Sequence, residues 1–167
     1  MDRRRFLKYG GASVIVAATA AAAAYYSWYV PKGSEEESKR EYTVLLVNEA
    51  VKRIEDAGEE AFPEFRHEGS KWFHDDWYVF VWRTDGIRVV YPPDPSGEGE
   101  DMRDQEDANG KPIGILFTDI ATSEPGQGWI DYEWPKPNET KPSKKHTYIK
   151  RAKFGGQTYL VGSGYYE

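Results

Sequence analysis

The amino-acid sequence predicts an α+β domain, and three patterns lead to that prediction. Apolar residues follow helical spacing over about residues 35–61. The second half of the chain contains segments rich in β-branched and aromatic residues, separated by turn-forming residues. A shorter helical pattern over about residues 112–122 interrupts these segments. We therefore expect a long N-terminal helix, a mostly antiparallel sheet of five strands and one inserted helix.

The long helix is predicted to begin after Ser34, because serine commonly caps helix N-termini. Glu35, Glu36 and Glu37 follow it, and negative charge is favourable at the positive end of the helix dipole. Pro63 is expected to end the helix, since proline has no backbone N–H to donate.

Five segments predict strands, at about residues 77–83, 87–91, 127–134, 144–153 and 157–165. Asp85-Gly86 joins the first two and is typical of a tight β-hairpin turn. Gly155-Gly156 joins the last two in the same way. Pro112 suits the first turn of the inserted helix, which is expected to reach Thr122 or Ser123.

The N-terminal segment has the layout of an export signal, with a basic stretch before an uncharged run from Tyr9 to Val30. The basic stretch resembles a twin-arginine signal through Arg3, Arg4, Phe6, Leu7 and Lys8. The uncharged run is close to the roughly 20 residues that span a bilayer. We predict that residues 1–30 are a cleaved signal peptide or a membrane anchor, and that residues 31–167 form one domain outside the cytoplasm. The alternative is a buried N-terminal helix of a cytosolic protein.

The composition limits the classes of function. The chain has a formal net charge of −6, so phosphate backbones would repel it and a nucleic-acid partner is not expected. It has no cysteine, which excludes thiol catalysis, thiolate metal sites and iron–sulfur clusters.

Other motifs for chemistry are weak. Asp104, Asp107 and Asn109 lack the closing glutamate of a calcium-binding loop. His67 and His74 lack a recognised metal-ligand spacing, and no serine is linked to a histidine and an acid. We therefore expect neither an enzyme nor a bound cofactor.

Aromatic rings, prolines and lysines gather in two segments, residues 128–137 and 145–150. Strand alternation places Tyr132 and Trp134 on one face, with Lys145 on the neighbouring strand. A cation beside phenol hydroxyls in a half-buried sheet is typical of small-carboxylate recognition. The same rings could instead fill a core, and the residues alone leave both interpretations open.

The order of motifs resembles the extracytoplasmic sensor domains of the single Cache type, which occur in chemoreceptors, sensor kinases and standalone exported proteins. The matching segments span residues 41–167 and are 61–65, 71–73, 77–81, 85–86, 107–111, 128–137, 145–148 and 162–166. The resemblance implies a PAS-like fold, with the long helix on one face of a five-stranded antiparallel sheet and a small-molecule pocket on the other. Related domains often bind short carboxylates.

By position in this family, six residues are candidates for lining the pocket: Trp72, Tyr78, Tyr91, Tyr132, Lys145 and Tyr148. The resemblance makes Lys145 the charge partner of a ligand. One departure is that many relatives carry His-Pro after the second strand, whereas this chain has Tyr91-Pro92-Pro93, which changes a polar contact of the pocket.

These observations predict an extracytoplasmic sensor module for a small carboxylate or similar metabolite. The sequence given ends just after the last predicted strand, so the module is expected to act through a separate membrane signalling protein. The alternative is a structural or interaction subunit of an envelope complex with a filled core. The two differ in whether Lys145 and Tyr148 face a cavity or packed side chains.

Overall fold

The computed structural model of the protein describes residues 34–167. The predicted export signal, with Arg3, Arg4, Phe6, Leu7 and Lys8, lies outside the described residues. Within residues 34–167, no helix combines the length and the apolar character that crossing a bilayer requires.

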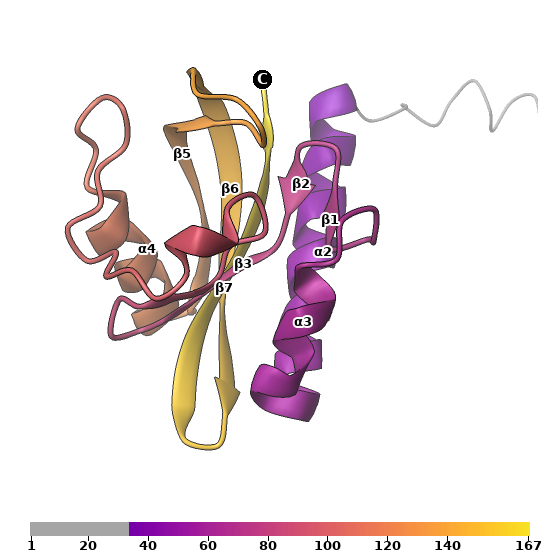
Figure 1. The fold of residues 1–167 in the computed structure, drawn as a ribbon, viewed down its shortest axis with the longest axis vertical. Coiled ribbons are helices and arrows are strands. Elements are labelled where there is room, and N and C mark those ends of the chain that lie inside the picture. The colour runs from indigo at the N-terminus through magenta and orange to yellow at the C-terminus, as the bar shows by residue number, and fades with distance from the viewer. Residues whose placement is uncertain (1–33) are drawn as a thin grey trace, which may run out of the picture. The chain divides into compact units, whose positions relative to one another are not determined.

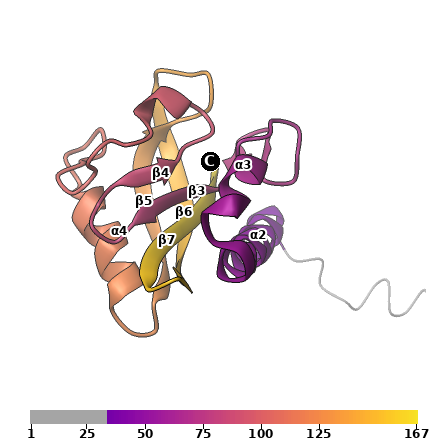
Figure 2. The same cartoon turned by 60° about the horizontal axis from the view of Figure 1, so that its bottom comes forward.

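The described domain is built on a five-stranded antiparallel sheet with the strand order β4-β3-β7-β6-β5. Helix α2 (Glu35–Ala57) covers one face, and helix α4 (Ile113–Thr122) lies on the other (Figures 1 and 2). The strands are β3 (Phe80–Arg83), β4 (Arg88–Val90), β5 (Gln127–Pro135), β6 (Pro142–Phe154) and β7 (Gln157–Tyr166). This arrangement confirms the predicted fold class.

Helix α2 ends earlier than its apolar pattern predicts. Gly58 adopts a positive φ of 62°, a conformation that glycine tolerates and that stops the helix. A Cβ at Gly58 would also lie 2.3 Å from the Phe154 ring, so the chain turns there at close contact with β6. A 3₁₀ helix (Gly58–Ala61) and the short helix α3 (Phe62–Phe65) follow, and Pro63 lies in the first turn of α3 rather than ending α2.

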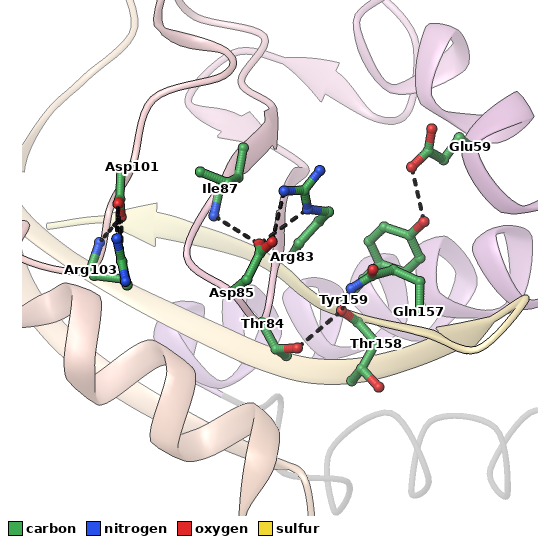
Figure 3. Close-up of polar contacts among 10 residues, drawn as sticks. All are labelled: Glu59, Arg83, Thr84, Asp85, Ile87, Asp101, Arg103, Gln157, Thr158 and Tyr159. Carbon is green, nitrogen blue, oxygen red and sulfur yellow. Dashed lines mark hydrogen bonds and ion pairs between the residues drawn. The ribbon is translucent and has the colours of Figure 1, made fainter.

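The β3–β4 turn confirms the predicted Asp-Gly hairpin (Figure 3). Asp85 pairs with Arg83 at 2.7 Å and accepts a hydrogen bond from the backbone N–H of Ile87. Gly86 has a φ of 94°. These local contacts fix the turn that brings β4 back along β3.

The β3–β4 ladder contains a bulge. Val81 pairs with Val90, but the next residue of β3, Trp82, pairs with Arg88. Val89 is the extra residue of the bulge. Because of it, the side chains of Arg88 and Val90 point to opposite faces of the sheet, although they are two positions apart. Arg88 consequently lies on the face of Trp82, opposite the face of Val81 and Val90.

Each face of the sheet carries its own apolar cluster. Between the sheet and α2, the cluster includes Val47, Ile54, Phe65, Trp72, Val81, Tyr148, Tyr159 and Val161. On the α4 face it includes Tyr78, Phe80, Trp82, Met102, Ile113, Phe117, Tyr132, Ile149 and Leu160. A two-stranded sheet, β1 (Phe73–His74) with β2 (Trp77–Tyr78), lies beside the upper part of α2 (Figure 1). Trp77 packs against the cluster under α2, whereas the next residue, Tyr78, belongs to the cluster on the α4 face.

Candidate ligand-binding site

The α4 face of the sheet holds a small cavity walled by aromatic rings. Its volume is about 20 Å³, room for about one water molecule. The residues that line it are Tyr78, Phe80, Trp82, Arg88, Tyr91, Ile113, Phe117, Tyr132 and Trp134. Most of these side chains are apolar, and the polar groups they carry are phenol hydroxyls, the two indole N–H groups and the guanidinium of Arg88.

Strand register sets the rings on β5. Tyr132 and Trp134 are two residues apart, so both point to the α4 face, as predicted. The hydroxyl of Tyr132 accepts a hydrogen bond from Thr147 Oγ1 at 3.2 Å, and Trp134 Nε1 donates to the Tyr91 hydroxyl at 3.1 Å. The polar tips of these rings are thus held by Thr147 of the neighbouring strand β6 and by Tyr91, which follows β4 at the opposite edge of the sheet.

Lys145 lies directly across β5 and β6 from Tyr132, and across β6 and β7 from Tyr166. Its side chain is fully buried. The Nζ atom lies 3.8 Å from the Tyr78 ring centroid, 5.1 Å from that of Tyr166 and 5.8 Å from that of Phe80. Among the described residues, none forms a hydrogen bond with this amine.

Two effects act in opposite directions on the pKa of Lys145. Burial lowers it well below its usual value, and the carboxylate of Asp76 raises it by a smaller amount. The ring faces also favour the charged form, but such contacts contribute about 2 kcal/mol when desolvated, less than the several kcal/mol that a buried ammonium loses in hydration. The structure therefore holds a buried amine that favours the neutral form and has no polar partner.

Tyrosine rings lie around the amine. Burial raises the pKa of Tyr78, Tyr132 and Tyr166, so these phenols keep their protons at neutral pH. The Tyr166 hydroxyl donates to the carbonyl of Pro135 at 2.6 Å. The last residue of β5 is thereby tied to the last residue of β7, which closes this end of the site.

The charged groups near the site are already paired. Lys136 Nζ lies 2.9 Å from Asp76, and Arg88 Nη2 lies 2.5 Å from Glu100. Arg88 Nε also donates to the carbonyl of Gly97 at 2.9 Å. Lys145 differs from Lys136 and Arg88 because no carboxylate lies within ion-pair distance of it in the described part of the chain.

Arg88 was missed by the sequence reasoning. In the segment Ile87–Tyr91, alternation places Arg88 on the same face as Val90, away from the cavity. The bulge at Val89 reverses this, and the guanidinium carbon lies 4.2 Å from the Tyr91 ring centroid. No signal in the sequence marks the bulge.

The structure divides the six predicted pocket residues. Tyr78, Tyr91 and Tyr132 line the cavity. Lys145 does not line it, but it contacts rings that do.

Two residues require a correction, because Trp72 and Tyr148 lie in the cluster under α2, on the opposite face of the sheet. Tyr148 is three positions from Lys145 along β6, so alternation points the two side chains to opposite faces. Trp72 packs against Phe65 with ring centroids 5.0 Å apart. Tyr148 packs against Trp129 with ring centroids 5.3 Å apart. The expectation that these two residues line the cavity is wrong.

No group of three or more His, Cys, Asp or Glu side chains within residues 34–167 is arranged to hold a metal ion. The site is therefore defined by aromatic rings, hydroxyls and one unpaired buried amine.

A long helix on one face of an antiparallel sheet, with an aromatic cavity on the other, is the architecture of the PAS-like sensor domains. Residues 67–167 match the family model of the Cache domain, and the chain belongs to this family. The fold is that of a single Cache domain.

Comparisons with individual proteins agree with this family. The methyl-accepting chemotaxis protein McpP of Pseudomonas putida is 28% identical over 93 residues, which are 56% of this chain and 16% of McpP. The chain thus spans about a sixth of the length of this curated relative.

Three solved structures are similar in fold. A periplasmic sensor domain of a chemotaxis protein is 26% identical with a TM-score of 0.62, and the match covers 80% of this chain and 98% of that one. A Cache chemosensory domain, studied for carboxylic acid recognition, is 24% identical with a TM-score of 0.65, covering 78% and 95%. A methyl-accepting chemotaxis protein of Vibrio parahaemolyticus is 19% identical with a TM-score of 0.61, covering 93% and 97%.

Proposed function

We propose that the protein is an extracytoplasmic sensor module that binds a short carboxylic acid and passes its occupancy to a separate membrane signalling protein. One observation carries the proposal: Lys145 is fully buried, has no polar partner in the described structure and lies against the rings of Tyr78, Tyr166 and Phe80. A buried polar group without a partner is costly, and a carboxylate would supply the missing partner. Membership of the Cache family and the relatives among chemotaxis proteins support a sensor role.

Binding requires a rearrangement of the rings. The cavity of about 20 Å³ is smaller than any carboxylic acid with a carbon chain. The Tyr78 ring both lines the cavity and lies against the Lys145 amine. We therefore propose that a ligand turns this ring aside, after which its carboxylate pairs with Lys145 and its short apolar end occupies the aromatic space.

The same movement offers a route to helix α2. Trp77 is the neighbour of Tyr78 in β2, and its Nε1 donates to Thr43 Oγ1 of α2 at 3.2 Å. Its ring also packs edge-on against Tyr42 of α2, with centroids 5.4 Å apart. A change at Tyr78 is thereby mechanically linked to the helix that leads toward the N-terminus, where we propose the export signal or anchor lies.

The experiment is thermal unfolding of the full chain with acetate, propionate, acetamide or ethylamine. Ligand at 100 times its dissociation constant should add about 2.7 kcal/mol of stability. We expect stabilisation by one or both acids and none by acetamide or ethylamine. Lys145→Met should lose the response, whereas the matched variant Lys153→Met, at an exposed position of β6, should keep it.

The second candidate is an interaction subunit with a filled core. Two observations favour it: rings pack around Lys145, and the neighbouring cavity has space for about one water molecule. An interaction subunit should not be stabilised by either acid at millimolar concentration. Lys145→Met should then change the stability of the protein without changing any response to acid.

The export route is a separate proposal. Replacing Arg3 and Arg4 together by lysine in a fusion with a folded reporter should stop export if the twin-arginine route is used. Continued export of the double variant would contradict that route without affecting the binding site.

A further inference from the structure

We propose that the site takes up the acid together with one proton, so that the carboxylate and Lys145 enter the charged state as a pair. This inference rests on the proposed function and specifies the chemical form of the ligand. The balance is one neutral amine, one carboxylate anion and one proton from solvent, which give a bound ammonium–carboxylate pair with no net charge.

Aromatic rings enclose the amine, and it has no acidic partner. Lys145 Nζ is enclosed by the rings of Tyr78, Tyr166 and Phe80, and no carboxylate lies within ion-pair distance in the part of the chain that the structure describes. An ammonium here would be a buried charge that only the more distant Asp76 compensates in part, and a carboxylate placed beside a neutral amine would also be a buried charge without a partner. A pair formed with a proton avoids both states, because its two charges compensate each other at contact distance.

The phenols near the amine do not supply a negative charge that could compensate a protonated Lys145. The phenols that face the site are Tyr78 from β2, Tyr132 from β5, Tyr166 from β7 and Tyr91 after β4, and burial raises the pKa of the first three.

The carboxylates nearby are already engaged by other groups. Asp76 is paired with Lys136, and Glu100 is paired with Arg88. Asp107, behind Tyr132, accepts hydrogen bonds from backbone N–H groups. None of these groups is positioned to neutralise Lys145 in place of the ligand.

The lowered pKa of Lys145 supports the same conclusion and sets the sign of the effect. Above that lowered pKa the free site holds the neutral amine, and an adjacent carboxylate raises the pKa when the ligand binds. Protons are therefore taken up on binding, and affinity must fall as the pH rises. Between the lowered pKa of the free site and the raised pKa of the complex, the dissociation constant is expected to increase about tenfold per pH unit.

Calorimetric titration of the full chain with acetate, in buffers of different ionisation enthalpy, measures the proton uptake directly. We expect close to one proton taken up per acetate bound, together with the tenfold loss of affinity per pH unit. The variant Lys145→Arg is the matched comparison, because a guanidinium stays charged. If this variant binds acetate, it should do so without proton uptake.

Two results would overturn the inference. Acetate binding with no proton uptake and with an affinity independent of pH would reject it and leave the proposed function intact. If acetate gives neither heat nor stabilisation anywhere in this pH range, the proposed carboxylate site fails as well. The wild-type titration alone separates these outcomes, whether or not the variant folds.

Discussion

The Nζ atom of Lys145 lies 3.8 Å from the centroid of the Tyr78 ring, and no described residue offers it a hydrogen bond. A lysine amine is rarely left in this state in the interior of a protein. The contact explains two properties of the site together. The ring contributes a weak favourable interaction with the amine, and it also occupies the place from which a stronger, anionic partner would reach it.

Lys145→Met should stabilise the protein when no ligand is added, by about 1–3 kcal/mol, because it removes an unsatisfied buried polar group. The gain should depend on pH. The folded state holds Lys145 with a lowered pKa, so the unfolded chain binds more protons below the usual lysine pKa, and wild-type stability from this group rises with pH.

The advantage of the methionine variant should therefore be largest at low pH and shrink as the pH rises toward about 10.4, the usual lysine value. Urea unfolding at several pH values measures it, with Lys153→Met as control. An advantage that is the same at every pH would contradict the lowered pKa.

Asp107 should stabilise the loop before α4 only while it is ionised. Burial raises its pKa, but the backbone N–H groups of Asn109, Lys111 and Glu133 donate to its carboxylate and lower the pKa overall. Its contribution is complete above the unfolded value of about 3.9 and is lost as the pH falls through the lower folded value.

Asp107→Ala should cost about 1–3 kcal/mol at neutral pH, because three part-buried hydrogen bonds from backbone N–H groups to a charged acceptor are lost. The difference from wild type should narrow in acid, as followed by urea unfolding at several pH values. Asp104→Ala, at an exposed position of the same loop, should have little effect at any pH. Equal losses from the two variants would reject this role for Asp107.

Gly162 permits the tip of the Phe80 ring to approach β7 closely. A Cβ at Gly162 would lie 2.3 Å from that ring, so Gly162→Ala should cost about 1–3 kcal/mol through overpacking. Gly128→Ala is the matched strand control, because its Cβ would lie 3.4 Å from Ile120, close to ordinary contact. Thermal unfolding of both variants tests the packing, and similar melting temperatures would argue against it.

Tyr132 and Tyr148 lie on opposite faces of the sheet, so variants of the two can distinguish an effect on ligand binding from an effect on core packing. Tyr132→Phe removes a hydroxyl of the cavity wall and its hydrogen bond with Thr147, and should weaken acetate binding several-fold. Tyr148→Phe changes the cluster under α2 and should leave acetate affinity unchanged. Titration calorimetry compares them, and an equal loss from both variants would show that the face assignment does not govern binding.

The sequence predicts most of the strands and their turns well because those features are local. The predicted strand 77–83 is wrong in part, because Trp77–Tyr78 form β2 of the two-stranded sheet and only Phe80–Arg83 form β3 of the main sheet. The Asp-Gly turn at residues 85–86 follows from the local sequence, and the position of Tyr132 and Trp134 on one face follows from strand alternation. The end of α2 was misplaced because Gly58 acts through its positive φ and through a contact with Phe154, which is distant in the sequence.

The candidate site was predicted only in part, for physical reasons. The resemblance to the Cache family placed Lys145 and Tyr148 in one pocket. Strand alternation along β6 points their side chains to opposite faces of the sheet, and this is the arrangement in the structure. Arg88 reaches the cavity through a bulge that depends on how two strands pair, which a single strand cannot reveal. The ring packing that covers Lys145 depends on residues from β2, β3 and β7 together.

The central claim is that the Lys145 amine is the partner of a short carboxylic acid. A crystal structure of the protein with acetate tests it most directly. We predict a carboxylate oxygen at about 2.7–2.9 Å from Lys145 Nζ, the distance of a charge-assisted hydrogen bond, with the Tyr78 ring turned away from its position over the amine. Acetate bound at Arg88 or elsewhere, with Tyr78 still covering Lys145, would contradict the claim.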